Sequence, residues 1–313
     1  MQTRQGLLLF CIWVLVGAIG LYSLKTPTDI TPWVDLRTQS TTDTAQTAPD
    51  STEQAGALEE KWLASDPKLS AGDTKSYTSC SDNVQVPTEE CEALVALYTT
   101  TAGETWKKKE HWLSNLSPCS WYGITCDAGH IVAIDLSNNG LEGPLPDQIG
   151  DLTLLRDLTL ADNQLNGAIP DAIGGCKALV NLVLSRNALT DQLPTSLYSI
   201  KTLQNIAVAR NQLTGKISPA ISALQNLRTL SVANNAFSGP LPETLSDLPE
   251  LSRLVVDNNQ FCDPLPESFS KLQIEDKIDL SNNQFIMEGY SPDMQNRIDA
   301  HIDRGTQDSA SCA

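Results

Sequence analysis

The sequence predicts an α/β repeat fold, a solenoid of seven 24-residue units whose short strands form one parallel sheet behind a cysteine-rich cap. Three observations predict it. An asparagine recurs every 24 residues, the positions around it are apolar at fixed offsets, and four of the eight cysteines lie together just before the first unit. A single unit cannot bury its own apolar face, so the array is stable only when its units stack.

The recurring asparagines that set the period are Asn139, Asn163, Asn187, Asn211, Asn235, Asn259 and Asn283. The third and fifth residues before each one and the second after it are aliphatic or Phe, as Ile134, Leu136 and Leu141 are in the first unit. This alternation predicts a short strand with one face turned inward. Each asparagine stands where the chain leaves its strand, and its amide can satisfy backbone groups that the turn leaves unpaired. We therefore predict a structural role for all seven.

A glycine and an aliphatic-proline pair follow most of the asparagines, as Gly167 and Ile169-Pro170 do in the second unit. With them, the units closely resemble the plant-type leucine-rich-repeat family, whose pattern is L-x-x-L-x-L-x-x-N-x-L-x-G-x-I-P. The resemblance implies a right-handed leucine-rich-repeat solenoid with its parallel sheet on the concave face and a second short strand in each Ile-Pro segment. Asp191 and Asp263 depart from the pattern at the glycine position.

The segment before the repeats matches the same family. Residues 91–98 form an expected amphipathic helix, and residues 119–126, CSWYGITC, are similar to the C-x-W-x-G-V-x-C box that caps plant-type repeat ectodomains. The resemblance covers residues 88–285 and extends to algal leucine-rich-repeat proteins without a kinase and to receptor-like proteins. It implies a disulfide-bonded N-terminal cap.

The cysteines indicate an oxidising compartment, because four of them cluster in a short segment ahead of the repeats. Cys11 lies in the apolar run at residues 5–24, and Cys176 is left over from the pairings that the resemblance implies. It is either a small residue on the convex side of the solenoid or a reactive thiol. The pairings that the resemblance implies are Cys80 with Cys91, Cys119 with Cys126, and Cys262 with Cys312.

Residues 5–24 are an uncharged run of 20 residues, and a helix of about 20 residues is long enough to cross a bilayer. We expect a transmembrane signal-anchor preceded by a short cytosolic tail, residues 1–4, which is too short for a signalling domain. A cleaved signal peptide is the alternative. Both interpretations place the rest of the chain outside, either on a single-pass protein of the plasma membrane or as a secreted protein.

The rest of the chain divides into four expected segments. Residues 25–79 are rich in Ser, Thr and acidic residues and lack a sustained apolar periodicity, which predicts a disordered stalk. Residues 80–130 form the N-terminal cap, residues 131–285 the repeats, and residues 286–313 a C-terminal cap or tail.

Composition excludes several functions. The net charge of −17 repels phosphate backbones, so nucleic acid is not an expected partner. The three histidines are scattered without metal-ligand spacing, so we expect no metal site and no cofactor. No histidine lies between His130 and His301, so we expect no Ser or Cys triad in the repeats. Asp135 and Asp157 lie on neighbouring strands, but no aromatic sugar platform accompanies them. We expect a binding protein rather than an enzyme.

The outward side chains of the predicted strands are the candidate binding surface. They are small and mildly polar, and they lack an aromatic anchor. Two interpretations stay open: a solvated sheet whose small residues only permit curvature, or a shallow groove for an extended peptide or glycan. The candidates on this surface are Asp157, Thr159, Asn181, Val183, Ser185, Asn205, Thr229, Ser231 and Arg253.

Two arginines add a charged element to this surface. Arg186 and Arg210 immediately precede their repeat asparagines, where every other unit has Asn or Asp. Equivalent positions on adjacent strands lie about 4.8 Å apart, so the two side chains should project together. Either nearby carboxylates relieve their repulsion, or the pair forms a fork for a carboxylate or sulfate of a ligand.

These features predict a membrane-tethered extracellular module that binds a protein, a peptide or a cell-surface glycan. With so short a cytosolic tail, such a module would act as a co-receptor and signal through a partner. Two alternatives are a secreted inhibitor of a foreign hydrolase, as polygalacturonase inhibitors with similar repeats are, and an adhesion or cell-wall structural protein.

Overall fold

The computed structural model describes residues 80, 85–274 and 278–307. Every described residue belongs to one compact unit, which lies within residues 70–313. The expected signal-anchor at residues 5–24 and the stalk at residues 25–79 lie outside the described residues. Within the described ranges, no helix combines the length and the apolar character needed to span a bilayer.

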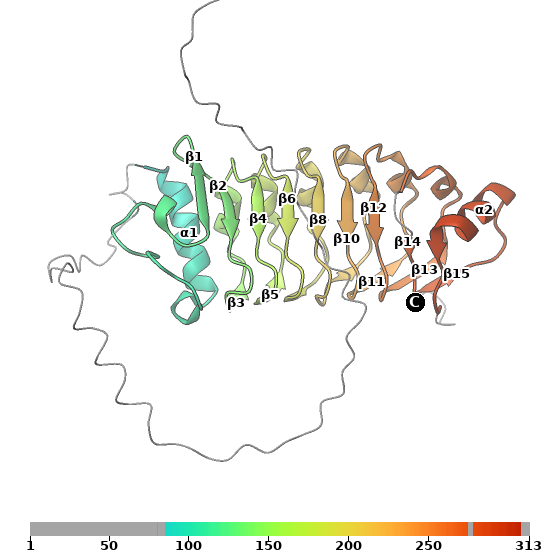
Figure 1. Cartoon of the computed structure of the whole chain (residues 1–313), viewed down its shortest axis with the longest axis horizontal. Helices are drawn as coiled ribbons and strands as arrows, with labels where there is room; N and C mark the ends of the chain where they lie inside the picture. The colour runs from blue at the N-terminus through green and yellow to red at the C-terminus, as the bar shows by residue number, and fades with distance from the viewer. Residues whose placement is uncertain (1–79, 81–84, 275–277, 308–313) are drawn as a thin grey trace, which may run out of the picture. The chain divides into compact units, whose positions relative to one another are not determined.

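The repeats build one long sheet, drawn across the middle of Figure 1. Among the described residues it has nine strands; β1 runs antiparallel to β2, and all later neighbours are parallel. From β2 onward, each strand pairs with residues 24 positions away, as Leu158 does with Leu182, so the sequence period becomes the sheet register. The strands in spatial order are β1 (Ile124–Asp127), β2 (His130–Asp135), β4 (Asp157–Thr159), β6 (Asn181–Val183), β8 (Asn205–Ala207), β10 (Thr229–Ser231), β12 (Arg253–Val255), β14 (Ile278–Asp279) and β16 (Ile302–Asp303).

A second short strand follows in each unit, as the family resemblance implied, and ends at or before the aliphatic-proline pair. These strands form two lateral sheets, β3-β5-β7 and β9-β11-β13-β15. Gly167 has φ 70° there, and Asp191 (63°) and Asp263 (66°) adopt the same left-handed conformation, which Asp tolerates better than most residues. The strands are β3 (Glu142–Pro144), β5 (Gln164–Ala168), β7 (Ala188–Thr190), β9 (Thr214–Gly215), β11 (Ala236–Gly239), β13 (Gln260–Pro264) and β15 (Gln284–Ile286).

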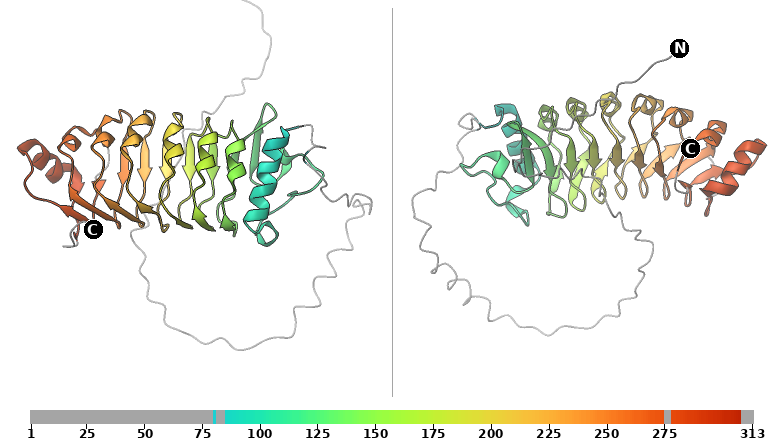
Figure 2. Two further views of the ribbon diagram at one scale, coloured as in Figure 1. Left: turned by 180° about the vertical axis from the view of Figure 1, so that it is seen from behind. Right: turned by 45° about the horizontal axis from the view of Figure 1, so that its top comes forward.

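Short 3-10 helices cover the side of the solenoid opposite the main sheet (Figure 2). Between them and the sheet lies an aliphatic core, extended by a stack of Phe237, Phe261 and Phe285 whose ring centroids are 6.1 and 6.2 Å apart. Cys176 is fully buried at the end of η6 and donates to the Ile149 carbonyl oxygen. The helices are η5 (Asp147–Asp151), η6 (Asp171–Gly175), η7 (Thr195–Ser199), η8 (Pro219–Ala223), η9 (Glu243–Asp247) and η10 (Glu267–Lys271).

The repeat asparagines form a ladder inside the turns. In Asn211, Nδ2 donates to the carbonyl oxygens of Leu184 and Val208, both at 3.0 Å, and Oδ1 accepts the Leu189 N–H at 3.0 Å. Leu184 and Leu189 belong to the preceding unit, so each amide ties two units together. The first ladder residue, Asn139, makes its bonds to the backbone of Lys108 in the cap.

The N-terminal cap packs helix α1 (Thr88–Thr100) and the 3-10 turns η3 (Gly103–Thr105) and η4 (Pro118–Ser120) against the first repeat. A cluster of contacting rings, Tyr98, Trp106, Trp112 and Trp121, forms its core. Disulfides join Cys80 to Cys91 and Cys119 to Cys126. Cys262 is also disulfide-bonded, and its expected partner Cys312 lies outside the described residues.

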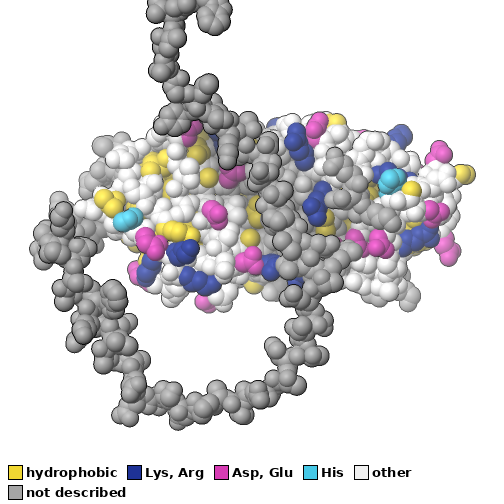
Figure 3. Space-filling view, in the orientation of Figure 1, with side chains coloured by type: hydrophobic (Ala, Val, Ile, Leu, Met, Phe, Trp, Pro, Cys, Tyr) yellow, Lys and Arg dark blue, Asp and Glu magenta, His cyan; other side chains and the backbone are white. Residues whose placement is uncertain are grey.

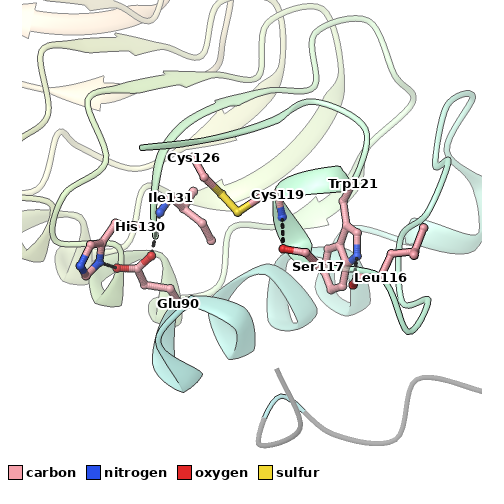
Figure 4. The surroundings of a disulfide bond; sticks show 8 residues. All are labelled: Glu90, Leu116, Ser117, Cys119, Trp121, Cys126, His130 and Ile131. Carbon is pink, nitrogen blue, oxygen red and sulfur yellow. Dashed lines mark hydrogen bonds and ion pairs between the residues drawn. A yellow bond between two sulfur atoms is a disulfide. The ribbon is translucent and has the colours of Figure 1, made fainter. Parts of the chain in front are cut away.

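A buried carboxylate fixes α1 to the main sheet (Figure 4). Glu90 is 4% exposed and accepts the Ile131 N–H at 2.8 Å, while its other oxygen lies 2.7 Å from His130 Nδ1. A buried carboxylate requires such partners, because an unpaired one would cost several kcal/mol. The cap is therefore continuous with the first strand of the array.

The C-terminal end adds a degenerate unit that the sequence did not predict. Helix α2 (Pro292–His301) buries Met294 and Ile298, and β16 then joins the main sheet. Gln307 stands 24 residues after Asn283 and reproduces its contacts: Nε2 donates to the Leu280 carbonyl oxygen and Oε1 accepts the Phe285 N–H, both at 2.9 Å. The expected tail thus closes the core with an eighth turn of the same design.

Candidate functional site

The strand face, meaning the outward side chains of the main sheet, carries the residues that the sequence proposed as a site. Figure 3 views this side and shows acidic and basic side chains interspersed over its visible part. The register places the candidates in rows across the strands. The entry row, at the first residue of each strand, contains Asp157, Asn181, Asn205, Thr229 and Arg253. The middle row contains Thr159, Val183, Ala207 and Ser231.

Small apolar side chains in the middle row and directly after it form a floor on the strand face. Ala161, Val183 and Ala207 are each 8% exposed and contact one another outside the main core. Ser185 lies beside them and is half-buried. Because the strand backbones are already paired within the sheet, only side chains can offer hydrogen bonds at this surface. A ligand here would meet a flat apolar floor with polar rows on both sides.

The entry row is linked by side-chain hydrogen bonds. Asn181 Nδ2 donates to Asp157 Oδ1, and Asn205 Nδ2 donates to Asn181 Oδ1. All three side chains are half-buried. Among the described residues, Thr229 and Arg253 continue the row without a side-chain hydrogen bond to it, and Arg253 is exposed. We call Asp157, Asn181 and Asn205 the amide row.

The exit rim consists of the residue before each repeat asparagine, and every member has a left-handed backbone. Arg186 has φ 59° and Arg210 has φ 58°. Asn and Asp, which fill the rim in the other units, adopt this conformation several times more often than other non-glycine residues. Two successive arginines therefore occupy positions with a left-handed backbone that arginine adopts less readily than Asn or Asp. The remaining members are Asn138, Asp162, Asn234, Asn258 and Asn282.

The two arginines differ in their partners. Arg186 Nη1 lies 3.3 Å from Asp162 Oδ1 in an exposed ion pair, so the structure relieves its charge within the rim. Arg210 is exposed and has no ion-pair partner among the described residues. The expected two-arginine fork is thus, in this structure, one satisfied arginine beside one available guanidinium.

The two ends of the rim are internally bonded. Lys107 Nζ donates to Asn138 Oδ1 at 2.6 Å at the cap end. At the other end, Asn282 Nδ2 donates to Asn258 Oδ1 and Thr306 Oγ1 donates to Asn282 Oδ1, both at 2.7 Å. These contacts are not predictable from the sequence, because they depend on side-chain conformations at equivalent positions of different units. Because both ends of the rim are bonded in this way, its centre is the part that remains available to a ligand.

Chemistry at other positions is limited. Across the described ranges, no group of three or more His, Cys, Asp or Glu residues is arranged to hold a metal ion. Burial raises the pKa of the Cys176 thiol to about 12, so at neutral pH it is protonated and a poor nucleophile. The structure therefore places this residue in the convex-side core.

Family models match two parts of this architecture. The model described as leucine rich repeat N-terminal domain matches residues 88–127, and the model described as Leucine Rich Repeat matches residues 130–152, 154–176 and 226–248. The described part of the chain is a plant-type leucine-rich-repeat domain. Its cap, asparagine ladder and second strands all follow that pattern.

Curated relatives of this leucine-rich-repeat domain are receptor kinases of Arabidopsis thaliana. The chain is 47% identical over 45 residues to the LRR receptor-like serine/threonine-protein kinase FEI 2. This match covers 14% of this chain and 8% of that one. It is 38% identical over 71 residues to the probable inactive receptor kinase RLK902, covering 22% and 10%. The chain thus spans about a tenth of the length of these relatives.

Solved structures of similar fold include a receptor kinase bound to a peptide hormone. The Arabidopsis receptor kinase HAESA in complex with the peptide hormone IDA and the co-receptor SERK1 matches with a TM-score of 0.55 and 25% identity, covering 64% of this chain and 38% of that one. The ectodomain of the Arabidopsis thaliana receptor kinase GASSHO1/SCHENGEN3 with CASPARIAN STRIP INTEGRITY FACTOR 2 matches with a TM-score of 0.60 and 28% identity, covering 63% of this chain and 24% of that one. The PEPR1-AtPEP1 complex matches with a TM-score of 0.56 and 27% identity, covering 65% and 32%.

Proposed function

We propose that this protein is an extracellular recognition module that binds a peptide or protein on its strand face, tethered to the membrane through residues 5–24. The observation that carries the proposal is the surface itself: an apolar floor bounded by the amide row and by a rim with one available guanidinium at Arg210. Such a surface can bind and orient a ligand, and it offers no nucleophile with an adjacent base.

A peptide suits this surface better than a glycan. Sugar sites need flat apolar partners for the faces of the rings, and the floor offers only Ala161, Val183 and Ala207. An extended peptide, in contrast, can lay small side chains on the floor and a carboxylate or sulfate against Arg210. The complex of HAESA with the peptide hormone IDA, whose fold is similar, supports a peptide ligand.

The test is ligand capture by the full chain displayed on cells, followed by affinity measurement with variants. Arg210→Ala should weaken binding by about tenfold, as the loss of a charge-assisted contact does. Arg186→Ala should weaken it less, because Asp162 already pairs with that arginine. Lys271→Ala on η10 removes the same charge from the opposite side and should leave affinity unchanged.

The tether is tested separately by membrane fractionation. Recovery of the intact chain in carbonate-washed membranes is expected. A soluble mature chain that begins near Leu21 would instead indicate secretion and would favour the inhibitor alternative.

In the binding test, equal affinity of the Arg210→Ala variant and the wild-type chain would remove the strand-face rim from the proposed site.

A further inference from the structure

The amide row has a direction, and Asp157 sets it. A carboxylate only accepts hydrogen bonds, so Asn181 must turn its NH2 group toward Asp157 and its oxygen toward the next strand. Asn205 must then donate to that oxygen. The direction of both amides therefore follows from one acid at the start of the row. Asn205 ends the row, and its Oδ1 has no hydrogen-bond partner among the described residues.

Each amide of such a row keeps one donor and one acceptor site. In a stacked amide ladder, the bonds along the stack use the carbonyl oxygen on one side and the N–H that points away from it on the other. The second N–H, which lies beside the carbonyl oxygen, and one lone pair of that oxygen stay available. In Asn205, both lone pairs of the oxygen are available within the described structure.

A paired donor and acceptor is the complement of an extended peptide residue. In a strand, the N–H and C=O of one residue point to the same side and exchange two bonds with a partner residue. The edge of a fixed Asn side chain can take the place of that partner. Such an amide edge binds the backbone of the peptide and not its side chains. This mode of binding suits a surface without deep specificity pockets.

We propose that Asn205 is a backbone-binding residue that makes a two-point hydrogen bond to one residue of an extended peptide, and that Asp157 is the positioning residue that holds it in register through Asn181. This inference rests on the proposed peptide-binding function. The floor at Val183 and Ala207 then receives a small side chain of the same peptide, and Arg210 its acidic group.

Geometry limits the contact to one full pair. Neighbouring strands place Asn181 and Asn205 about 4.8 Å apart, whereas same-side residues of an extended peptide repeat about every 6.6 Å. A straight peptide crossing the strands therefore cannot pair fully with both amides. Asn205 is favoured because its oxygen carries no internal bond. Asn181 serves mainly to transmit the orientation that Asp157 imposes.

The test couples a protein variant to a change in the peptide backbone. The full chain in nanodiscs is probed with a random-sequence peptide library, and a retained peptide is resynthesised with single N-methyl groups along its backbone. N-methylation at the position that faces Asn205 should weaken binding to the wild-type chain by about tenfold, because it leaves an acceptor unpaired. The same N-methyl group should have no effect on the Asn205→Ala chain, which is the signature of a coupled pair.

Controls separate this inference from the proposed function. Asn205→Thr, which copies the residue at the next strand, is a second variant in case Asn205→Ala does not fold. Lys271→Ala on η10, on the side opposite the strand face, should keep the wild-type N-methyl profile. Asp157→Asn should flatten that profile, because the row can then run in either direction.

Two outcomes would overturn the proposals at different levels. An identical N-methyl profile for the wild-type and Asn205→Ala chains, with binding still dependent on Arg210, would refute the backbone role of Asn205 and leave the proposed function standing. No peptide retained by the wild-type chain above the Arg210→Ala chain would refute the proposed function itself.

Discussion

Replacing Asn211 with Ala tests how the ladder stabilises the solenoid. The carbonyl oxygens of Leu184 and Val208 would each keep a second amide donor, from Asn187 and Asn235 respectively. The Leu189 N–H, in contrast, would lose its Asn211 Oδ1 acceptor. One stranded donor costs about 1 to 3 kcal/mol, and the two lost bonds add about 0.5 to 1.5 kcal/mol each. The expected loss is therefore about 2 to 6 kcal/mol.

The assay is urea unfolding together with hydrogen exchange of the full chain. The damage should concentrate in the third and fourth units, because units of a solenoid contact only their neighbours. Gln212→Ala, next in the sequence and exposed, is the matched control and should change stability by less than about 0.5 kcal/mol. Unchanged exchange at Leu189 in the Asn211→Ala chain would refute the reasoning, because that amide would then not depend on the ladder.

Three further predictions concern the caps and the buried thiol. Peptide mapping without reduction should link Cys119 to Cys126, and removing this bond should cost about 2 to 5 kcal/mol. Alkylation of Cys176 at pH 8 should require unfolding, since burial raises the pKa of its thiol to about 12; rapid labelling of the folded chain would contradict its burial. Hydrogen bonds from Ser291 lower the pKa of the Glu267 carboxyl. The melting temperature of wild type should therefore exceed that of Glu267→Gln at neutral pH, and the difference should vanish as pH falls through the lowered pKa.

The repeat core could be predicted from the sequence because its signals are periodic. The 24-residue spacing of Asn139 to Asn283 determines strand position, register and ladder contacts together, since each unit meets an identical neighbour. The asparagine spacing does not reveal Gln307, because Gln replaces Asn at this ladder position and the unit contains an α-helix instead of a 3-10 turn. A search that allowed Gln at the ladder position would have found it.

The positions of the candidate site residues could be predicted from the sequence, but their side-chain contacts could not. Alternation placed Asn181, Asn205 and Arg210 on the outward face, which the strand register requires. Whether Arg186 meets Asp162 or stands free depends on rotamers and on the left-handed backbone of the rim. Neither leaves a periodic trace in the sequence, because both arise from contacts between unlike side chains.

Site-specific photo-crosslinking tests the central claim, that ligands bind the strand face, most directly. A photoreactive residue is placed at Ser231 on the middle row, and in a separate chain at Gln225, which is exposed and follows η8 on the opposite side. The account predicts that captured ligand crosslinks to the chain carrying the probe at position 231 and not to the one at position 225. Crosslinks from position 225 alone would contradict it.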